Sequence, residues 1–313
     1  MTQLQPLPNI MESDSNSITD EKVKLGRLLF FDKRFSKNHD ISCNSCHGLD
    51  TFGVDNKQFS LGHKGQLGGR NAPTVYNAAL HLAQFWDGRA KDVEEQAKGP
   101  VLNPVEMAMP NEAKVLEVIN SITEYQKLFA AAFPGKNSVS YDNFGKAIGA
   151  FERKLVTPSK FDAFVNGKKD ALTSTEKKGL VKFIETGCIS CHNGPAMGGN
   201  MYMKIGLVKS WPNLKDQGRY DLTKKDIDKH VFIVPSLRNI EKTGPYLHDG
   251  TIKSLDKVVS MMAEHQLGRK LSSEDTGLIV TFLKTLTGKA DSKLIAEPTL
   301  PESSVTTPKA DPK

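Results

Sequence analysis

The apolar residues of this chain recur three and four residues apart in four segments, two in each half of the sequence. In the first half, one segment runs from residue 20 toward the first cysteine-containing motif and another covers residues 141–155. The corresponding segments of the second half cover residues 174–187 and 272–286. Such spacing places an apolar face along a helix. The pattern predicts a mainly α protein whose two halves each open and close on an amphipathic helix.

Polar residues mark the ends of the two opening helices. Thr19 stands directly before the first apolar segment and is a typical N-cap residue. Thr173 and Glu176 have the spacing of a capping box. Gly187 is expected to end the second opening helix, because glycine readily adopts the left-handed conformation found there.

The segments between these helices are long and contain glycine and proline. Residues 48–110 and 193–250 exceed ordinary connections by far, so we expect long loops wrapped around bound groups. A hydrophilic passage at residues 158–169 is expected to join the halves. Domains are therefore expected at 1–160 and 161–290, followed by a polar tail at 291–313 that is either disordered or laid across a neighbouring surface.

All four cysteines belong to two Cys-x-x-Cys-His motifs, one in each half of the chain. This motif is the attachment pattern of covalently bound c-type haem, with two sulfurs for the porphyrin and a histidine for the iron. The sequence therefore predicts two c-type haems, attached through these residues: Cys43, Cys46 and His47 in the first half, and Cys188, Cys191 and His192 in the second.

Two other uses of paired cysteines explain the sequence less well. Zinc ribbons place their two Cys-x-x-Cys pairs about 15 to 20 residues apart, whereas these pairs lie in different halves and are each followed by histidine. A thioredoxin-like redox pair explains one motif but not its duplicate. Haem attachment accounts for both.

Charge and hydropathy indicate no nucleic-acid partner and no membrane span. The formal net charge is +6 and the pI is near 8.9, but the lysines are scattered rather than gathered in a basic run. No segment has the roughly 20 apolar residues that a spanning helix needs. Residues 1–17 do not resemble a secretory signal, yet c-type haem is attached outside the cytoplasm. We therefore expect a mature periplasmic protein whose leader has been removed.

The remaining iron ligands are not determined by spacing alone. Five histidines outside the motifs are candidates: His63, His81, His230, His248 and His265. Seven methionines could instead supply a thioether sulfur: Met107, Met109, Met197, Met201, Met203, Met261 and Met262. An isolated methionine is more often core filler than a ligand.

Several motifs closely resemble the bacterial dihaem cytochrome c peroxidases. They are AQFWDGR at 83–89, Gln96, NPVEM at 103–107 and PYLHDG at 245–250, and the resemblance covers residues 26–286. It implies two cytochrome c-like domains, with a low-potential peroxidatic haem in the first and a high-potential electron-transfer haem in the second.

The resemblance also implies a different ligand pair for each iron. His47 and a removable His63 would bind the first iron, and His192 and Met262 the second, with Met261 as the rival of Met262. A thioether ligand favours ferrous iron and raises the potential, whereas two imidazoles lower it.

Further residues take roles from the same resemblance. Glu106 would move a proton during peroxide cleavage, Gln96 would be the pocket amide, and Trp86 would assist electron transfer between the haems. An interdomain calcium ion would bind the side chain of Asn71 and the backbone of Thr243 and Pro245. His248 has no assigned role, and Arg70 and Arg89 are candidates for pairing with haem propionates.

The implied activity is reduction of hydrogen peroxide to water with electrons from a small cytochrome c or a cupredoxin. Reduction of the second haem would release His63, and the glycines around His63 would let its loop swing. A homodimer is expected. Two rivals are a dihaem electron carrier without catalysis and a related enzyme that oxidises a tryptophan on a partner protein. The second rival has tyrosine where Met262 stands, so it resembles this chain less.

Overall fold

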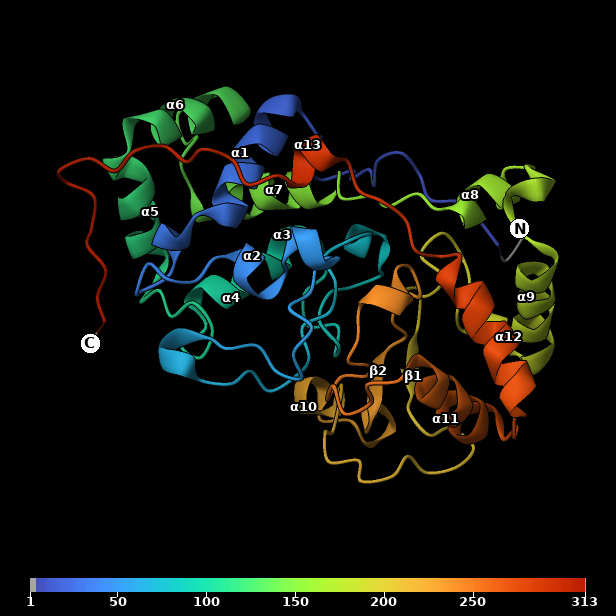
Figure 1. The fold of residues 1–313 in the computed structure, drawn as a ribbon. Helices are drawn as coiled ribbons and strands as arrows, with labels where there is room; N and C mark the ends of the chain where they lie inside the picture. The colour runs from blue at the N-terminus through green and yellow to red at the C-terminus, as the bar shows by residue number, and fades with distance from the viewer. Residues whose placement is uncertain (1–3, 313) are drawn as a thin grey trace. The chain divides into compact units, whose positions relative to one another are not determined.

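A computed structural model describes residues 4–312 and is built mainly from helices (Figure 1). The α-helices are α1 (Asp20–Phe31), α2 (Cys43–Cys46), α3 (Val93–Gln96), α4 (Gly99–Leu102), α5 (Glu112–Ser121), α6 (Thr123–Ala132), α7 (Tyr141–Glu152), α8 (Lys160–Val165), α9 (Ser174–Thr186), α10 (Tyr220–Thr223), α11 (Leu255–Leu267), α12 (Ser273–Lys284) and α13 (Ser292–Ile295). Short 3-10 turns connect many of them, and strands β1 (Tyr202–Lys204) and β2 (Val231–Ile233) form an antiparallel pair.

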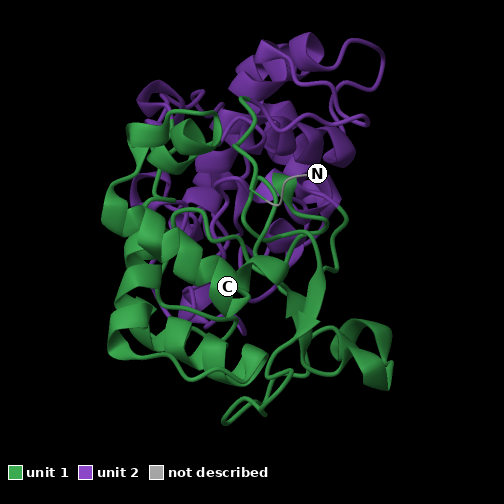
Figure 2. Cartoon of the chain, turned by 90° about the vertical axis from the view of Figure 1, so that its right-hand side faces the viewer, with its two compact units in different colours: residues 1–9, 80–91, 156–290 green, residues 10–79, 92–155, 291–313 purple. Residues whose placement is uncertain are grey.

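The chain folds into two compact units, and neither is continuous in sequence (Figure 2). Unit 1 contains the residues up to Asn9, then Leu80–Lys91 and Val156–Ala290. Unit 2 contains Ile10–Ala79, Asp92–Leu155 and the chain from Asp291 onward. The expected domains, by contrast, are uninterrupted stretches of sequence. Each unit contains one of the two cysteine motifs.

In unit 2, α1 packs against α7 through a glycine. Thr19 caps α1 as expected, since its side chain accepts a hydrogen bond from the backbone N–H of Lys22 at 3.3 Å. The helix ends at Phe31, well before the cysteine motif that it was expected to reach. A Cβ atom added at Gly26 would lie only 1.9 Å from the carbonyl oxygen of Ala147 on α7. The two backbones can approach this closely because residue 26 has no side chain.

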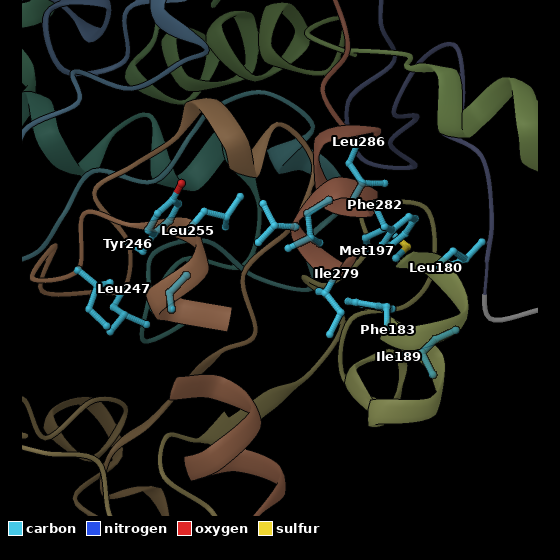
Figure 3. Close-up of a cluster of buried hydrophobic side chains, with 14 of the residues drawn as sticks. Leu180, Phe183, Ile189, Met197, Tyr246, Leu247, Leu255, Ile279, Phe282 and Leu286 are labelled. Atoms are coloured by element: carbon cyan, nitrogen blue, oxygen red, sulfur yellow. The ribbon is translucent and has the colours of Figure 1, made fainter. Parts of the chain in front are cut away.

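Unit 1 repeats this arrangement with α9 and α12. Thr173 and Glu176 form the expected capping box, and Gly187 ends α9 with a φ of 96°. At the helix crossing, a Cβ atom added at Gly179 would lie 2.1 Å from the carbonyl oxygen of Leu278. The side chains of Phe183 on α9 and of Ile279 and Phe282 on α12 form part of a buried apolar cluster (Figure 3).

Replacing either crossing glycine by alanine should destabilise its unit. We expect Gly26→Ala and Gly179→Ala each to lower the free energy of unfolding by about 1–3 kcal/mol, the usual cost of overpacking. Gly277→Ala on α12 is the matched control, because nothing lies within 4 Å of an added Cβ there. It should be neutral or stabilising by about 0.5–1 kcal/mol. Thermal and denaturant unfolding measure all three, and equal stability of Gly179→Ala and Gly277→Ala would contradict the packing argument.

The stretches expected to be long loops contain more regular structure than the sequence pattern predicted. Within 193–250, β1 pairs with β2 so that Tyr202 faces Ile233 and Lys204 faces Val231. Within 48–110 lie α3 and α4. These elements have three or four residues each, too few for a sequence periodicity to appear.

The expected interdomain connection and the tail are both packed segments. Residues 160–165 form α8, in which Phe161 is fully buried and Asp162 pairs with the buried guanidinium of Arg238 at 2.8 Å. The tail lies along unit 2: the Arg27 guanidinium donates to the carbonyl of Ala296, and the backbone N–H of Asp311 donates to the carbonyl of Lys37 at 2.8 Å. The tail was expected to be either disordered or laid across a neighbouring surface, and in the structure it is laid across a surface. No helix within residues 4–312 combines the length and apolar character required to cross a membrane.

Candidate haem sites

The first cysteine motif forms a single helical turn, α2. Ser42 caps it, because its backbone N–H bonds to the hydroxyl of Ser45 at 2.9 Å in a capping box. The backbone N–H of His47 then donates to the carbonyl of Cys43 at 2.9 Å. Cysteines three residues apart on a helical turn lie on one side of it. Both Cys43 and Cys46 are half-buried free thiols, so they are available for covalent attachment.

The ring of His47 is held by the chain that follows it. Its Nδ1 lies 3.3 Å from the carbonyl oxygen of Gly53, so Nδ1 carries the proton and Nε2 is the coordinating nitrogen. Burial lowers the pKa of His47, which favours the neutral imidazole. A neutral ring with an oriented Nδ1–H is the form in which histidine binds a metal.

His63 lies on a short, tightly closed loop. The backbone N–H of Gly62 donates to the carbonyl of Gln66 at 2.8 Å, and the side-chain amide of Gln66 donates to the carbonyl of His63 at 3.1 Å. Lys64 and Gly65 both have positive φ, 53° and 72°. The His63 side chain is only 7% exposed, and its Nδ1 is buried without a hydrogen-bond partner among residues 4–312. A buried nitrogen of this kind fits an iron ligand, and Nε2 of the rival His81 in unit 1 is buried without a partner within residues 4–312 in the same way, so the assignment of His63 stays a prediction.

The His63 loop packs directly on the segment that contains Glu106. The backbone N–H of His63 donates to the carbonyls of Val105 and Glu106 at 3.0 and 2.8 Å. A Cβ atom added at Gly62 would lie 1.9 Å from the carbonyl oxygen of Val105. The structure thus joins the predicted removable ligand and the predicted acid–base residue through their backbones.

Glu106 is half-buried and lies near the first cysteine motif. Its Oε1 accepts a hydrogen bond from the side-chain amide of Asn103 at 2.8 Å. Burial is the main cause that raises the pKa of the Cys43 and Cys46 thiols, and the negative charge of Glu106 contributes to both. Gln96, half-buried, is the last residue of α3. The structure therefore brings Glu106 to the first motif and anchors Gln96 on a helix of the same unit.

The second cysteine motif forms a 3-10 turn directly after α9. The left-handed Gly187 redirects the chain, and the backbone N–H of His192 donates to the carbonyl of Cys188 at 3.0 Å. Cys188 and Cys191 are half-buried free thiols, as in the first motif. Burial lowers the pKa of His192 to about 4, so the ring is neutral at physiological pH. Both motifs therefore present two thiols beside a neutral imidazole.

Met261 and Met262 both lie on α11 and are both partly buried against the apolar cluster of unit 1. Their shared position means that the assignment of the ligand to Met262 stays a prediction. Two rival histidines of this unit have Nδ1 on a carbonyl oxygen: Nδ1 of His230 contacts that of Asp216 at 2.8 Å, and Nδ1 of His265 that of Ser210 at 2.9 Å. As in His47, such a contact leaves Nε2 as the nitrogen that could bind a metal, so it excludes neither residue.

Trp86 packs in unit 1 against His248. Their ring centroids are 6.3 Å apart with an edge-to-face geometry, and the His248 ring stacks on Phe232 at 4.1 Å. The carbonyl oxygen of Trp86 also accepts the backbone N–H of Ile233 at 2.9 Å. His248, which had no assigned role, is therefore the centre of an aromatic stack that includes Trp86.

The predicted calcium ligands are divided between the units. Asn71 of unit 2 is buried, and its Nδ2 donates to the carbonyl of Lys57 at 2.8 Å. Thr243 and Pro245 of unit 1 flank Gly244 in a half-buried turn that contains a cis peptide bond. The side-chain oxygen of Asn71 and the backbone carbonyls of the turn are the oxygen types that calcium takes. Of the two candidates for propionate pairing, Arg89 pairs with Asp87 at 3.1 Å, and the roles of Arg70 and Arg89 stay predictions.

Sequence reasoning missed a buried carboxyl group near the first motif. Glu152, at the end of α7, is 3% exposed, and burial together with the charge of Glu94 raises the pKa of Glu152 to about 8. It contributes in turn to the raised pKa of Cys43. Its neighbour Arg153 pairs with Glu94 at 2.8 Å. A glutamate on a helix is ordinarily exposed, so no signal in the sequence distinguished this one.

Together these features define the class of protein. Each unit combines a Cys-x-x-Cys turn of two free thiols with a neutral histidine, and unit 2 adds His63, whose Nδ1 is buried without a partner within the described chain. These donors fit haem of the c type, and a carboxylate lies close to one of the two sites. The fold and these donors therefore define a mainly helical protein with two candidate haem sites.

Comparisons with known proteins give the family. A family model described as di-haem cytochrome c peroxidase matches residues 20–170. The cytochrome c551 peroxidase of Nitrosomonas europaea is 48% identical over 295 residues, covering 93% of this chain and 87% of that protein. The cytochrome c551 peroxidase of Pseudomonas aeruginosa is 44% identical, covering 97% and 89%. This chain belongs to the di-haem cytochrome c peroxidase family.

A solved structure supports the same fold. A MauG-like protein associated with microbial copper homeostasis superimposes with a TM-score of 0.79 at 27% identity, over 93% of this chain and 95% of that one. The family implies two haems and makes the chain a peroxidase, an oxidoreductase. The rival interpretation as an electron carrier without catalysis is less supported.

Proposed function

We propose that this enzyme reduces hydrogen peroxide to two molecules of water with electrons delivered singly by a small soluble cytochrome c or cupredoxin in the periplasm. The names of the relatives, cytochrome c551 peroxidase, support a cytochrome donor. Each haem is attached through the two cysteines of its motif. When bound, the haems supply the redox-active iron and store the two electrons that peroxide cleavage requires.

The observation that carries this proposal is the contact between the His63 loop and the Glu106 segment. His63 closes the first site as long as its backbone N–H bonds to the carbonyls of Val105 and Glu106. Release of the loop breaks these bonds and uncovers the side of the site where Glu106 stands. The removal of a ligand is in this way coupled to the exposure of a proton-transfer group.

Glu106 is the residue that moves the proton. Its carboxylate would accept a proton from one peroxide oxygen and return it to the departing oxygen, which leaves as the first water; two protons from solvent and the two electrons would complete the second. Asn103 donates to Oε1 at 2.8 Å and thereby sets the orientation of the carboxylate. The side-chain amide of Gln96 would donate a hydrogen bond to peroxide in the first site. Trp86 takes part in electron transfer, and the stacked ring of His248 keeps its indole in place.

The two sites differ in the ligand opposite the motif histidine. His63, on a glycine-rich loop, is removable, whereas Met262, on the long helix α11, is permanent. A thioether stabilises ferrous iron, so one electron is stored at the second site before peroxide binds at the first. We propose in addition that reduction of the second site activates the enzyme by releasing His63.

Activation is tested with the oxidised and the half-reduced protein. We expect peroxide turnover to be low in the fully oxidised enzyme and to rise after one-electron reduction, together with the appearance of high-spin iron in spin-resonance spectra. A His63→Gly variant should be active without reduction. Equal turnover of the oxidised and half-reduced wild type would exclude the switch, and two low-spin irons with no turnover in either state would exclude the peroxidase.

Calcium is proposed to bind the side chain of Asn71 and the carbonyls of Thr243 and Pro245. We expect a chelator to lower the turnover of the half-reduced enzyme and added Ca²⁺ to restore it. Mg²⁺ should not substitute, because it demands a smaller octahedral site and gives up its water reluctantly. Asn71→Ala should raise the Ca²⁺ concentration needed for half-maximal recovery. Undiminished turnover after complete chelation would contradict a role of calcium in activity.

We also propose that the enzyme is a homodimer. Sedimentation of the same samples tests this proposal.

A further inference from the structure

The C-terminal turn of α11 is tied to a neighbouring segment of unit 1 by an unusually complete set of polar contacts. The side-chain oxygen of Gln266 accepts the backbone N–H groups of Gly206 and Leu207, the latter at 3.1 Å. Its side-chain nitrogen donates to the carbonyl of Lys204 at 3.1 Å. A single amide thus bonds three backbone groups at the end of β1.

His265 adds a second set of bonds to the same segment. Its carbonyl oxygen accepts the backbone N–H groups of Val208 and Lys209, both at 3.0 Å. Its Nδ1 faces the carbonyls of Lys209 and Ser210 at 3.1 and 2.9 Å, so this nitrogen is the donor. The ring, 7% exposed, packs on the indole of Trp211 with centroids 5.1 Å apart. We call residues 204–211 with His265 and Gln266 the clasp.

The clasp binds the C-terminal turn of α11, the part of a helix that has the fewest internal hydrogen bonds. The last four carbonyls of an α-helix have no partner within the helix, and terminal turns open more readily than central ones. Met262 lies three residues before His265 and four before Gln266, which places it on the same side of the helix about one turn away. Motion of the clasped turn therefore moves the Met262 side chain directly.

We propose that His265 and Gln266 are positioning residues that hold α11 in the register at which the thioether of Met262 binds the second haem iron. The inference rests on the proposed role of Met262 and extends it to two side chains that act on the haem site through the position of α11. Because the thioether favours ferrous iron, a clasp that keeps it in place also sets the potential of the second site.

The test measures the midpoint potential of the second haem and its long-wavelength sulfur-to-iron absorption band. Gln266→Leu and His265→Phe remove hydrogen bonds but keep bulk and, for phenylalanine, the ring against Trp211. We expect the reduction equilibrium to fall at least tenfold in each, which is about 59 mV for one electron, with a weaker band. His265→Asn retains a donor near the Nδ1 position and should recover most of both signals.

A control separates the clasp from the general stability of α11. Ser254→Ala removes the N-cap bond to the backbone N–H of Lys257, 3.3 Å, and so loosens the same helix at its other end. It should lower the unfolding temperature while the band and the potential stay unchanged. A shift in Ser254→Ala equal to that in Gln266→Leu would overturn the clasp, as would unchanged signals in both clasp variants.

Met262→Ala distinguishes failure of this inference from failure of the ligand assignment. Loss of the band in Met262→Ala with unchanged clasp variants overturns the clasp alone. A band that survives in Met262→Ala and disappears in Met261→Ala overturns the assignment of Met262, and the inference with it. Loss in Met262→Ala and weakening in both clasp variants supports the two together.

Discussion

We expect the Glu106→Gln variant to lose peroxide turnover by a factor of about 10² to 10⁴, the usual contribution of a general acid–base group. Glutamine has nearly the same shape and keeps an oxygen for the side-chain amide of Asn103, which donates to Glu106 at 2.8 Å. It cannot take up and return a proton. The loss should therefore appear in steady-state turnover of the half-reduced enzyme, while the spectra of both haems remain those of the wild type.

Glu124→Gln is the matched control for this change. Glu124 is an exposed carboxylate on α6 in the same unit, so its replacement alters the net charge equally. Its turnover should equal that of the wild type. If Glu106→Gln retained turnover within about threefold of the wild type, another group would have to transfer the proton, because a lost acid–base step costs at least tenfold more.

The Gly62→Ala variant should be active without prior reduction. An added methyl group would meet the carbonyl oxygen of Val105 at 1.9 Å, so the His63 loop cannot remain on the Glu106 segment. The two hydrogen bonds from the backbone N–H of His63 would be lost or lengthened. At about 0.5–1.5 kcal/mol each, they shift the closed-to-open equilibrium by about 5- to 150-fold. Turnover of the oxidised enzyme and its fraction of high-spin iron should both rise.

Gly68→Ala is the control in the same loop. The atoms nearest to an added Cβ at Gly68 are 3.8 Å away, so the closed loop can accommodate it. This variant should keep the low oxidised-state turnover of the wild type. An oxidised Gly62→Ala enzyme as inactive as Gly68→Ala, with His63 still bound by spectroscopy, would show that the contact with Val105 does not hold the loop closed.

The haem motifs and the helices around them were predictable because their signals are local. A Cys-x-x-Cys-His turn needs only five consecutive residues, and the caps at Thr19 and Thr173 each depend on neighbours within one helical turn. The structure confirms both caps, the αL end at Gly187 and the closing helices α7 and α12. The motifs that contain Glu106 and His248 indicated the family of di-haem cytochrome c peroxidases. The similarity to two cytochrome c551 peroxidases confirms this family.

Features built from distant residues were not predictable in the same way. No periodicity indicated that residues 80–91 fold with the second half of the chain, that the tail lies along unit 2, or that Glu152 is buried. Each depends on partners far away in the sequence. The clasp is of the same kind, because Gln266 acquires a role only when residues 204–207 lie against it.

By itself, the sequence determined where haem attachment is expected and where the main helices begin and end, since these signals act through neighbours only a few residues away. The reaction followed from the resemblance of its motifs to the di-haem cytochrome c peroxidases. The tertiary structure alone decided how the parts are coupled: that Gly62 and His63 rest on the backbone of Val105 and Glu106, and that the clasp holds the helix of Met262. The physical reason is the short range of the interactions that join these parts. Hydrogen bonds and close packing act over a few ångströms, and only the folded chain brings residues about 40 to 60 positions apart within that distance.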